Sequence, residues 1–476
     1  MMLENTKLKV ILLVLSVCSC ALGQSYLPNW ESINSRPLPA WYDQSKFGIF
    51  IHWGVYSVPA FAVPAAPGAE WYWYNLEFNT DNGSTRAYHD DSFGADFTYQ
   101  TFAPMFKANL FDPQQWANLF VASGAKYVVL TSKHHEGFTL WPNSQAWGWN
   151  SVDIGPGKDL VGLVSKYVKQ AGLHMGLYHS LYEWFNPLYD MNNATTPPVS
   201  DSYVTQVLLP QLYDVVNSYE PEVGMYQTFI PKTIITILTF FISYQSKVWA
   251  DGDWEQNSTY WKSTDFLAWL YTNSSVKDTV VTNDRWGSDC GGKNGGYWTP
   301  SDRYNPGTSW GYNQNEALDQ YQNTTSLIQT LVSTVSCGGN LLLDVGPTAE
   351  GVIPMLMQER LIQIGEWLST NGEAIYNTTF WRVQNDTIDE NIWYTTNAHT
   401  GAVYAMSFYW PTNSILTLEA PIVQRTTTIE LLGYGESLSY STANGQKSGL
   451  NIKLPFLTPG QYPPHGVYTF KLSNVL

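Results

Sequence analysis

The chain has 476 residues, a formal net charge of −16 and a pI near 4.8. It is too long for one ordinary domain and can bury a large core. Binding to nucleic acid needs a basic face, so the acidic balance argues against nucleic acid as a partner. Aromatic residues make up 15% of the chain, including 21 Trp. Tryptophan-rich pockets often stack on sugar rings, although an aromatic core is the commoner explanation of any single Trp.

Residues 1–23 have the pattern of a secretory signal peptide. Lys7 and Lys9 precede an apolar run over residues 10–15, and small residues at 20–23 offer a cleavage site before Gln24. The mature chain would then retain two cysteines, Cys290 and Cys337, which could form one bridge or stay as free thiols.

Seven Asn-X-Ser/Thr sequons accompany the predicted signal peptide. They lie at Asn82, Asn193, Asn257, Asn273, Asn323, Asn377 and Asn385. Together they indicate an N-glycosylated protein of the secretory route. The acidic pI would suit an acidic lumen, so we expect the protein in the lysosome or outside the cell.

From residue 26 to residue 372, short apolar runs alternate with helical patterns. The expected strands are 47–51, 127–131, 175–178, 248–251, 280–282 and 341–344, and the expected helices are 113–124, 160–172, 204–219, 266–271, 326–335 and 359–368. This alternation predicts an α/β domain with a parallel sheet. The number of repeats favours a (β/α)8-like barrel over residues 24–376, with a doubly wound sheet as the alternative.

Nearly every expected strand is apolar until its C-terminal end, where His, Asp, Tyr, Asn or Arg follows. Such ends converge on one mouth of a barrel, where active sites form. In the stretch 248–255, a buried strand delivers Asp251 between Trp249 and Trp254. The alternative is a simple turn, with Asp251 or Asp253 capping the next helix.

Two further groups of residues are candidates for the site. His134 and His135 could bind a metal, but neighbouring histidines on a strand point to opposite faces, and no HExxH or cysteine ligand set accompanies them. We expect no metal and no other cofactor; the pair suits hydrogen bonding to hydroxyl groups, or simple packing at the barrel rim. Glu70 and Trp71 open an aromatic loop, 70–74, that suits the wall of a sugar site. Carboxylates among aromatic walls point to glycoside hydrolysis.

After about residue 378 the helical patterns disappear. Short β patterns occur at 392–395, 402–406, 415–418, 427–431, 452–454 and 467–470. We therefore expect residues 377–476 to form an all-β C-terminal sandwich.

Several long blocks together resemble the α-L-fucosidases, particularly the animal lysosomal type. These blocks are 47–59, 70–71, 124–138, 249–254 and 283–287, and the resemblance covers nearly the whole mature chain. It implies a retaining exo-glycosidase that releases terminal L-fucose from glycoproteins and glycolipids without a cofactor. Fucosylated glycans would be its partners, and a homo-oligomer is possible.

The resemblance also implies roles for individual residues. Asp251 matches the nucleophile, which forms a covalent fucosyl-enzyme. The positions matching those that hold fucose are His52, Glu70, Trp71, His134, His135, Tyr178, Trp249, Arg285 and Trp310. Retaining chemistry needs a second carboxyl roughly 5–5.5 Å from the first.

The chain departs from this family pattern in two places. A Lys-Trp-Glu-x-Cys stretch, whose Glu is the usual candidate acid/base, is absent after residue 307, which leaves Asp302 as the expected acid/base. Residues 224–247 form an atypical insertion whose apolar run is too short and too interrupted for a membrane span. Both departures suggest a gene-model or splicing artefact. The alternative function is therefore a catalytically impaired fucose-binding protein, from a truncated or mis-spliced isoform.

Overall fold

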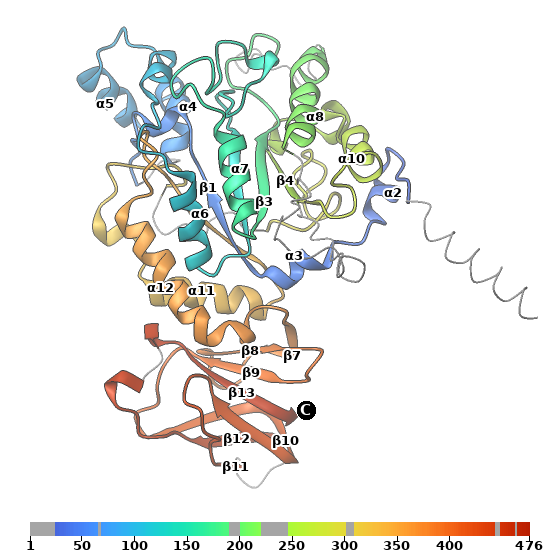
Figure 1. Ribbon diagram of the computed structural model, residues 1–476, viewed down its shortest axis with the longest axis vertical. Helices are drawn as coiled ribbons and strands as arrows, with labels where there is room; N and C mark the ends of the chain where they lie inside the picture. Colours follow the sequence, from blue (N-terminus) through green and yellow to red (C-terminus); the bar gives the residue numbers. More distant parts are fainter. Residues whose placement is uncertain are drawn as a thin grey trace, which may run out of the picture.

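The computed structural model describes residues 24–64, 68–189, 200–219, 246–300, 309–442, 448–461 and 464–476. The expected signal peptide, the sequon at Asn193, residues 224–245 of the expected insertion and the candidate acid Asp302 lie outside these ranges. The chain forms an α/β domain followed by a smaller all-β domain, drawn in red at the bottom of Figure 1.

The α/β domain is built on six parallel strands in the order β5-β4-β3-β2-β1-β6. Their bounds are β1 (Phe47–Ile51), β2 (Tyr127–Lys133), β3 (His174–Ser180), β4 (Ser246–Asp251), β5 (Val281–Thr282) and β6 (Leu341–Val345). The predicted parallel α/β domain is confirmed, and each expected strand is present.

One face of this sheet encloses a cluster of buried side chains. Phe50, Tyr127, Tyr178, Trp249 and Leu342 belong to it, as does Val281 of β5. The strands β5 and β6 lie at opposite edges of the sheet, yet both contribute to the same cluster. The sheet therefore curls around these residues as a barrel does around its interior.

The expected helices are also present, with bounds α6 (Pro113–Ala122), α7 (Leu160–Gln170), α8 (Leu209–Ser218), α10 (Ser263–Thr272), α11 (Thr324–Ser336) and α12 (Met355–Asn371). Local chemistry sets their starts: the side chain of Asp112 accepts from backbone N–H groups at the start of α6, and that of Asn323 does so for α11. The predicted helix 204–219 begins with a π-helical turn, η6 (Val204–Leu208), because Pro210 has no N–H for a regular helical bond.

Short helices were missed by the sequence patterns: α2 (Trp30–Asn34), α3 (Ala40–Ser45), α4 (Tyr72–Phe78), α5 (Ser84–Ser92) and α9 (Ser258–Trp261). The expectation of a loop over 70–74 is wrong, since η2 (Ala69–Trp71) leads directly into α4. Within the described ranges, no helix is both long and apolar enough to cross a membrane.

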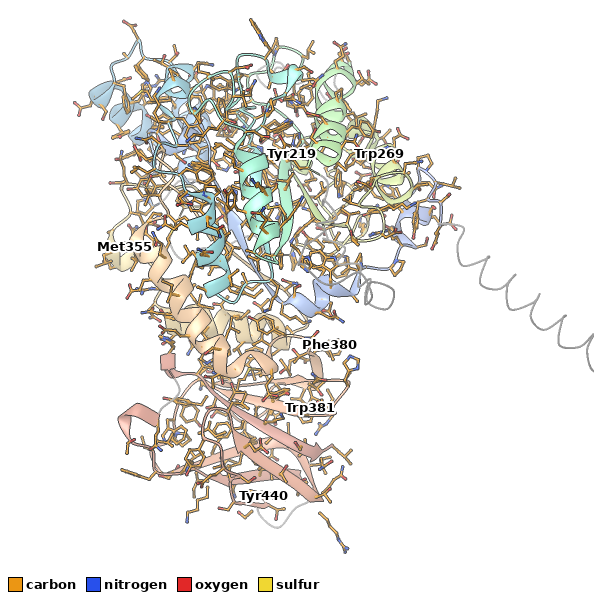
Figure 2. The ribbon with its side chains drawn as sticks, in the orientation of Figure 1. Tyr219, Trp269, Met355, Phe380, Trp381 and Tyr440 are labelled. Carbon is orange, nitrogen blue, oxygen red and sulfur yellow. The ribbon has the colours of Figure 1, made fainter. Side chains whose placement is uncertain are left out.

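The second domain is antiparallel, as predicted, with the strand order β11-β12-β10-β13-β9-β8-β7. The bounds are β7 (Thr379–Asn385), β8 (Ile392–Thr396), β9 (Val403–Ser407), β10 (Ile415–Leu431), β11 (Tyr440–Thr442), β12 (Ser448–Lys453) and β13 (Tyr468–Val475). The long strand β10 pairs with β12 in its first part and, after a break in register, with β13 in its last part. It thereby joins the two layers of a sandwich. Trp381 on β7 and Tyr440 on β11 mark opposite ends of this domain in Figure 2.

The sandwich packs against α11 and α12. The indole Nε1 of Trp367 donates to the carbonyl of Val467 at 2.9 Å. Tyr404, Met406 and Val467, all from the sandwich, belong to the same hydrophobic cluster as the core of the α/β domain. The two domains thus share one continuous core at their junction.

Candidate active site

Asp251 lies at the end of β4, with three polar groups around its carboxylate. The Tyr178 hydroxyl donates to Oδ2 at 2.8 Å, and Arg285 Nη1 donates to Oδ1 at 3.0 Å. His135 Nε2 lies 3.6 Å from Oδ2. The Asp251 side chain keeps 15% of its surface exposed, so it stays reachable from solvent. A cation and a hydroxyl donor on separate oxygens suit an ionised carboxylate.

Arg285 is held in place by the segment that follows β5. Asn283 clamps that segment to β4: its Oδ1 accepts from Ala250 N at 3.1 Å, and its Nδ2 donates to Ala250 O at 2.7 Å. Arg285 Nε also donates to Thr299 Oγ1 at 3.1 Å. Thr299 in turn donates to Asp284 Oδ1 at 2.6 Å. These bonds fix the direction of the guanidinium toward Asp251.

The expectation that His134 and His135 point to opposite faces is wrong. The strand β2 ends at Lys133, and the two rings, both buried, have centroids only 4.2 Å apart. The chain turns there, because Gly137 adopts a φ of +80° and its N–H bonds to His134 O at 3.0 Å. Leaving the strand allows both rings to face the site.

The environment of the two histidines keeps them neutral. Burial, together with the nearby His52, lowers the pKa of His134 to about 3. Burial also lowers the pKa of His135 well below its ordinary value. His135 is oriented by Ser180 Oγ, 2.7 Å from its Nδ1, and by the Tyr182 ring, which is stacked at 4.7 Å and 6°. Neutral imidazoles suit hydrogen bonding to hydroxyl groups.

His52 forms a buried pair with Asp344 at the end of β6. Its Nδ1 lies 2.7 Å from Asp344 Oδ1. Burial opposes protonation of His52, but the charge and hydrogen bond of Asp344 outweigh burial and raise its pKa. Asp344 was expected only as a strand end; the same pattern of a charged residue closing an apolar strand could have placed it in the site.

Glu70 is buried beside the ring of candidate residues. Its Oε2 accepts from Gly311 N at 2.9 Å and from Ser309 Oγ at 3.4 Å. Ser309 Oγ also accepts from Ala69 N at 2.7 Å, which links η2 to the segment before Trp310. The Trp310 ring is 5.3 Å from that of His52. The η2 turn and the segment 309–311 therefore form one wall.

These side chains enclose a cavity of about 220 Å³. The expected residues that line it are His52, Glu70, Trp71, His134, Tyr178, Trp249, Asp251, Arg285 and Trp310. His135 is absent from the lining, but its Nε2 lies 3.6 Å from Asp251 Oδ2. Trp254, which the sequence named as a neighbour of Asp251 but not as a site residue, also lines the cavity, as do Trp298, Thr299 and Pro300, which the sequence missed.

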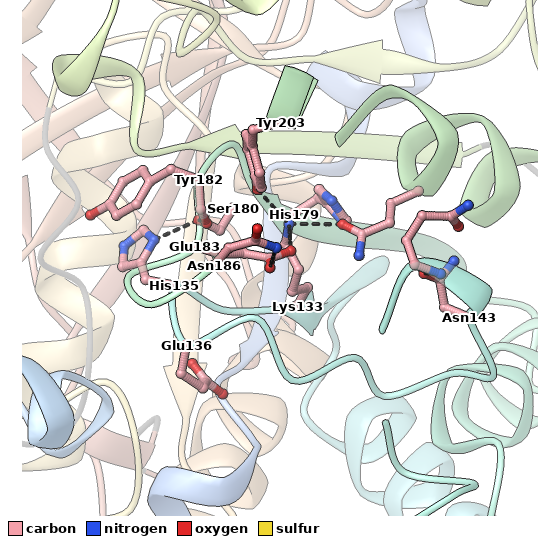
Figure 3. A network of polar contacts seen from close by, with 12 residues as sticks. Lys133, His135, Glu136, Asn143, His179, Ser180, Tyr182, Glu183, Asn186 and Tyr203 are labelled. Carbon is pink, nitrogen blue, oxygen red and sulfur yellow. Dashed lines mark hydrogen bonds and ion pairs between the residues drawn. The ribbon is translucent and has the colours of Figure 1, made fainter. Parts of the chain in front are cut away.

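A buried network behind the site was not foreseen either (Figure 3). Lys133 Nζ donates to Glu183 Oε1 at 3.0 Å, to Gln211 Oε1 at 2.9 Å and to the Tyr203 hydroxyl at 3.3 Å. Glu183 lies in the loop after β3, whose Trp184 N donates to His135 O at 2.8 Å. The network therefore anchors the loop that supports His135.

In the part of the chain that the structure describes, no group of three or more His, Cys, Asp or Glu side chains could hold a metal ion. Of the two alternatives for Cys290 and Cys337, the structure has free thiols: Cys290 is buried and Cys337 is exposed.

Comparison with known proteins gives consistent matches along the chain. The family model for alpha-L-fucosidase matches residues 13–228 and 225–373, and that for the alpha-L-fucosidase C-terminal domain matches residues 384–473. The chain is 50% identical to the alpha-L-fucosidase of Dictyostelium discoideum, over 98% of this chain and 100% of that protein. It is 43% identical to the tissue alpha-L-fucosidase of Homo sapiens, over 94% of this chain and 92% of that protein. A crystal structure of Thermotoga maritima alpha-fucosidase in complex with a mechanism-based inhibitor is 32% identical, with a TM-score of 0.77, over 94% of this chain and 99% of that one.

Proposed function

This chain belongs to the α-L-fucosidase family, and on that premise we propose that it hydrolyses terminal α-L-fucose from glycoproteins and glycolipids with retention of configuration. The observation that carries the proposal is the Asp251 carboxylate at the cavity wall, with Tyr178 and Arg285 on its two oxygens. A covalent fucosyl-enzyme is the intermediate that such a carboxylate forms.

In the first step an Asp251 oxygen attacks the anomeric carbon, and the bond to the leaving oxygen breaks. Tyr178 and Arg285 hold the two Asp251 oxygens in fixed directions before the attack, so little reorganisation is needed. In the second step water attacks the same carbon and releases Asp251 as a carboxylate.

Asp302 is the proposed acid that protonates the leaving oxygen and then activates water. It lies outside the described residues, but Pro300, two positions earlier, lines the cavity. Retaining chemistry requires this second carboxyl to lie about 5–5.5 Å from that of Asp251.

The remaining cavity residues would hold the fucose ring. Neutral His134 can donate a hydrogen bond to a hydroxyl group of the sugar or accept one from it. The buried Glu70 can accept a hydrogen bond from another hydroxyl group. The rings of Trp71, Trp249 and Trp310 supply apolar walls. Because these groups recognise hydroxyls and a sugar ring, we propose no cofactor.

We also propose that the protein is N-glycosylated and acts in the lysosome or after secretion. Its relatives include proteins named tissue and plasma alpha-L-fucosidase. The sequons at Asn82, Asn257, Asn273, Asn323 and Asn377 lie at exposed positions, where a glycan could be attached.

The proposal is tested by following the hydrolysis of 4-nitrophenyl α-L-fucoside by proton NMR. The first-formed product should be α-fucose, since two inversions restore the configuration. Asp251→Ala should abolish turnover, and azide should restore it by producing β-fucosyl azide. Asp319→Ala, at an exposed aspartate, is the matched control and should keep full activity. Well-folded protein that binds fucose without any turnover would contradict the proposal and leave a fucose-binding protein.

A further inference from the structure

Two tryptophans at the cavity have unusually exposed rings. Trp254 keeps 46% of its surface exposed and Trp298 keeps 68%, and both line the cavity that contains Asp251. Large exposed apolar groups beside a binding cavity are a common mark of a ligand contact.

The two rings differ in what they already contact. The Trp254 ring is stacked near Trp71 at 6.3 Å and 23°, and its Nε1 donates to Glu255 Oε1 at 3.1 Å. Within the described ranges, the side chain of Trp298 is 68% exposed and makes neither a ring contact nor a hydrogen bond. Trp298 is therefore the ring that is open to a ligand.

The backbone on both sides of Trp298 is fixed. Tyr297 N donates to Thr282 O at 2.9 Å, and Thr299 N donates to Asp284 Oδ1 at 3.1 Å. Gly296 lies so close to β5 that a Cβ there would be 1.7 Å from Thr282 O. An exposed ring on a fixed backbone loses little conformational entropy when a ligand stacks on it.

Trp298 also lines a second cavity of about 210 Å³ and so belongs to the walls of both cavities. The second cavity is lined by Asn34, Lys293 and Asn294 as well as by Arg36. These side chains carry amide and cationic groups, which suit the hydroxyl groups of a carbohydrate.

We propose that Trp298 is the stacking platform for the sugar to which the fucose is attached. The apolar face of that sugar would lie on the indole, and the rest of the glycan would continue toward the second cavity. This inference rests on the proposed function, because it assigns the leaving-group side of the same site. It makes Trp298 a specificity-determining residue for fucosyl oligosaccharides.

The test compares two substrates that differ only on the leaving-group side. α-L-Fucosyl fluoride has no sugar there, whereas 2-O-α-L-fucosyl-galactose has one. Trp298→Ala should lower kcat/KM for the disaccharide roughly threefold to tenfold, the range expected for one lost aromatic contact. Its kcat/KM for the fluoride should stay unchanged. Trp147→Ala, at a tryptophan that is 87% exposed and does not line the cavity, should change neither value.

A binding measurement makes the test independent of turnover. In the Asp251→Ala background, Trp298→Ala should weaken the disaccharide in titration calorimetry by a similar factor and leave the affinity for fucose unchanged. Equal losses for both ligands, or no loss for either, would overturn the inference. Failure of the proposed function has a different signature, namely that the unmodified chain hydrolyses neither the fluoride nor the disaccharide.

Discussion

Replacing Lys133 with methionine should destabilise the protein strongly. The ammonium group has three acceptors at 2.9–3.3 Å, and its side chain is fully buried. Methionine removes the cation but leaves Glu183, whose side chain is 9% exposed, with a buried charge. Breaking a buried ion pair in this way costs about 3–5 kcal/mol, far more than the 0–1 kcal/mol of an exposed pair.

The double variant Lys133→Met with Glu183→Gln separates this charge effect from lost packing. With the carboxylate neutralised, no unpaired charge remains, so the double variant should be at least about 1 kcal/mol more stable than Lys133→Met alone. The free energy of unfolding would be measured by urea denaturation at pH 6. Lys107→Met, at an exposed lysine, is the control and should stay within about 0.5 kcal/mol of the unmodified chain.

A loss below about 1 kcal/mol for Lys133→Met, or a double variant no more stable than the single one, would refute this reasoning. The same variant has an expected effect on the site. The loop that Glu183 anchors carries Tyr182, which stacks on His135. The Michaelis constant for an aryl fucoside should therefore rise in Lys133→Met, because His135 is less well supported.

Three further predictions follow from the described contacts. Burial raises the pKa of Glu136 from 4.5 to about 8, so between these values the folded chain holds a proton that the unfolded chain has lost. The free energy of unfolding, measured by urea denaturation, should thus fall as pH rises from 5 to 8. This fall should be smaller in Glu136→Gln. Gly296→Ala would place a Cβ 1.7 Å from a carbonyl oxygen of β5, and should cost about 1–3 kcal/mol of stability. Arg285→Lys should lower kcat/KM for fucosyl fluoride about 10- to 100-fold, because a lysine cannot hold both Asp251 and the neighbouring threonine.

Each of these predictions has a matched comparison. Glu31→Gln changes an exposed glutamate and should leave the pH dependence of the free energy of unfolding as it is. If Glu136→Gln also had the pH dependence of the unmodified chain, Glu136 would not be the group that holds the proton. Gly291→Ala meets no atom within 4 Å and should be tolerated, so equal stability of the two alanine variants would count against the close approach at Gly296. Arg382→Lys lies in the sandwich and should keep full activity. Unchanged activity of Arg285→Lys would remove Arg285 from the site.

Much of the architecture was predictable because it depends on local pattern. Apolar runs that end in a polar residue located the strands. They also predicted that His52, Asp251 and Arg285 lie at the same end of the sheet, and these residues line one cavity. The same pattern points to Tyr178 at the end of the strand 175–178, whereas only the resemblance to a family added Trp310.

The missed features depend on contacts between distant parts of the chain. His52 and Asp344 are 292 positions apart, and Lys133 and Glu183 are 50 apart. Only the folded sheet brings such pairs together. The turn after β2 depends on the left-handed conformation of Gly137, with a φ of +80°, and a strand pattern that continues through the two histidines does not contain it.

The shared core between the sandwich and helices α11 and α12 limits how these two modules can be exchanged. Trp367 from α12 and Val467 from the sandwich are joined by a hydrogen bond, and Tyr404 and Met406 complete the same apolar cluster. A recombination event that replaced the sandwich alone would place the contact residues of α11 and α12 against those of a foreign sandwich. Successful hybrids between relatives should therefore inherit α11, α12 and the sandwich as one block, and the exchangeable unit is larger than the all-β domain.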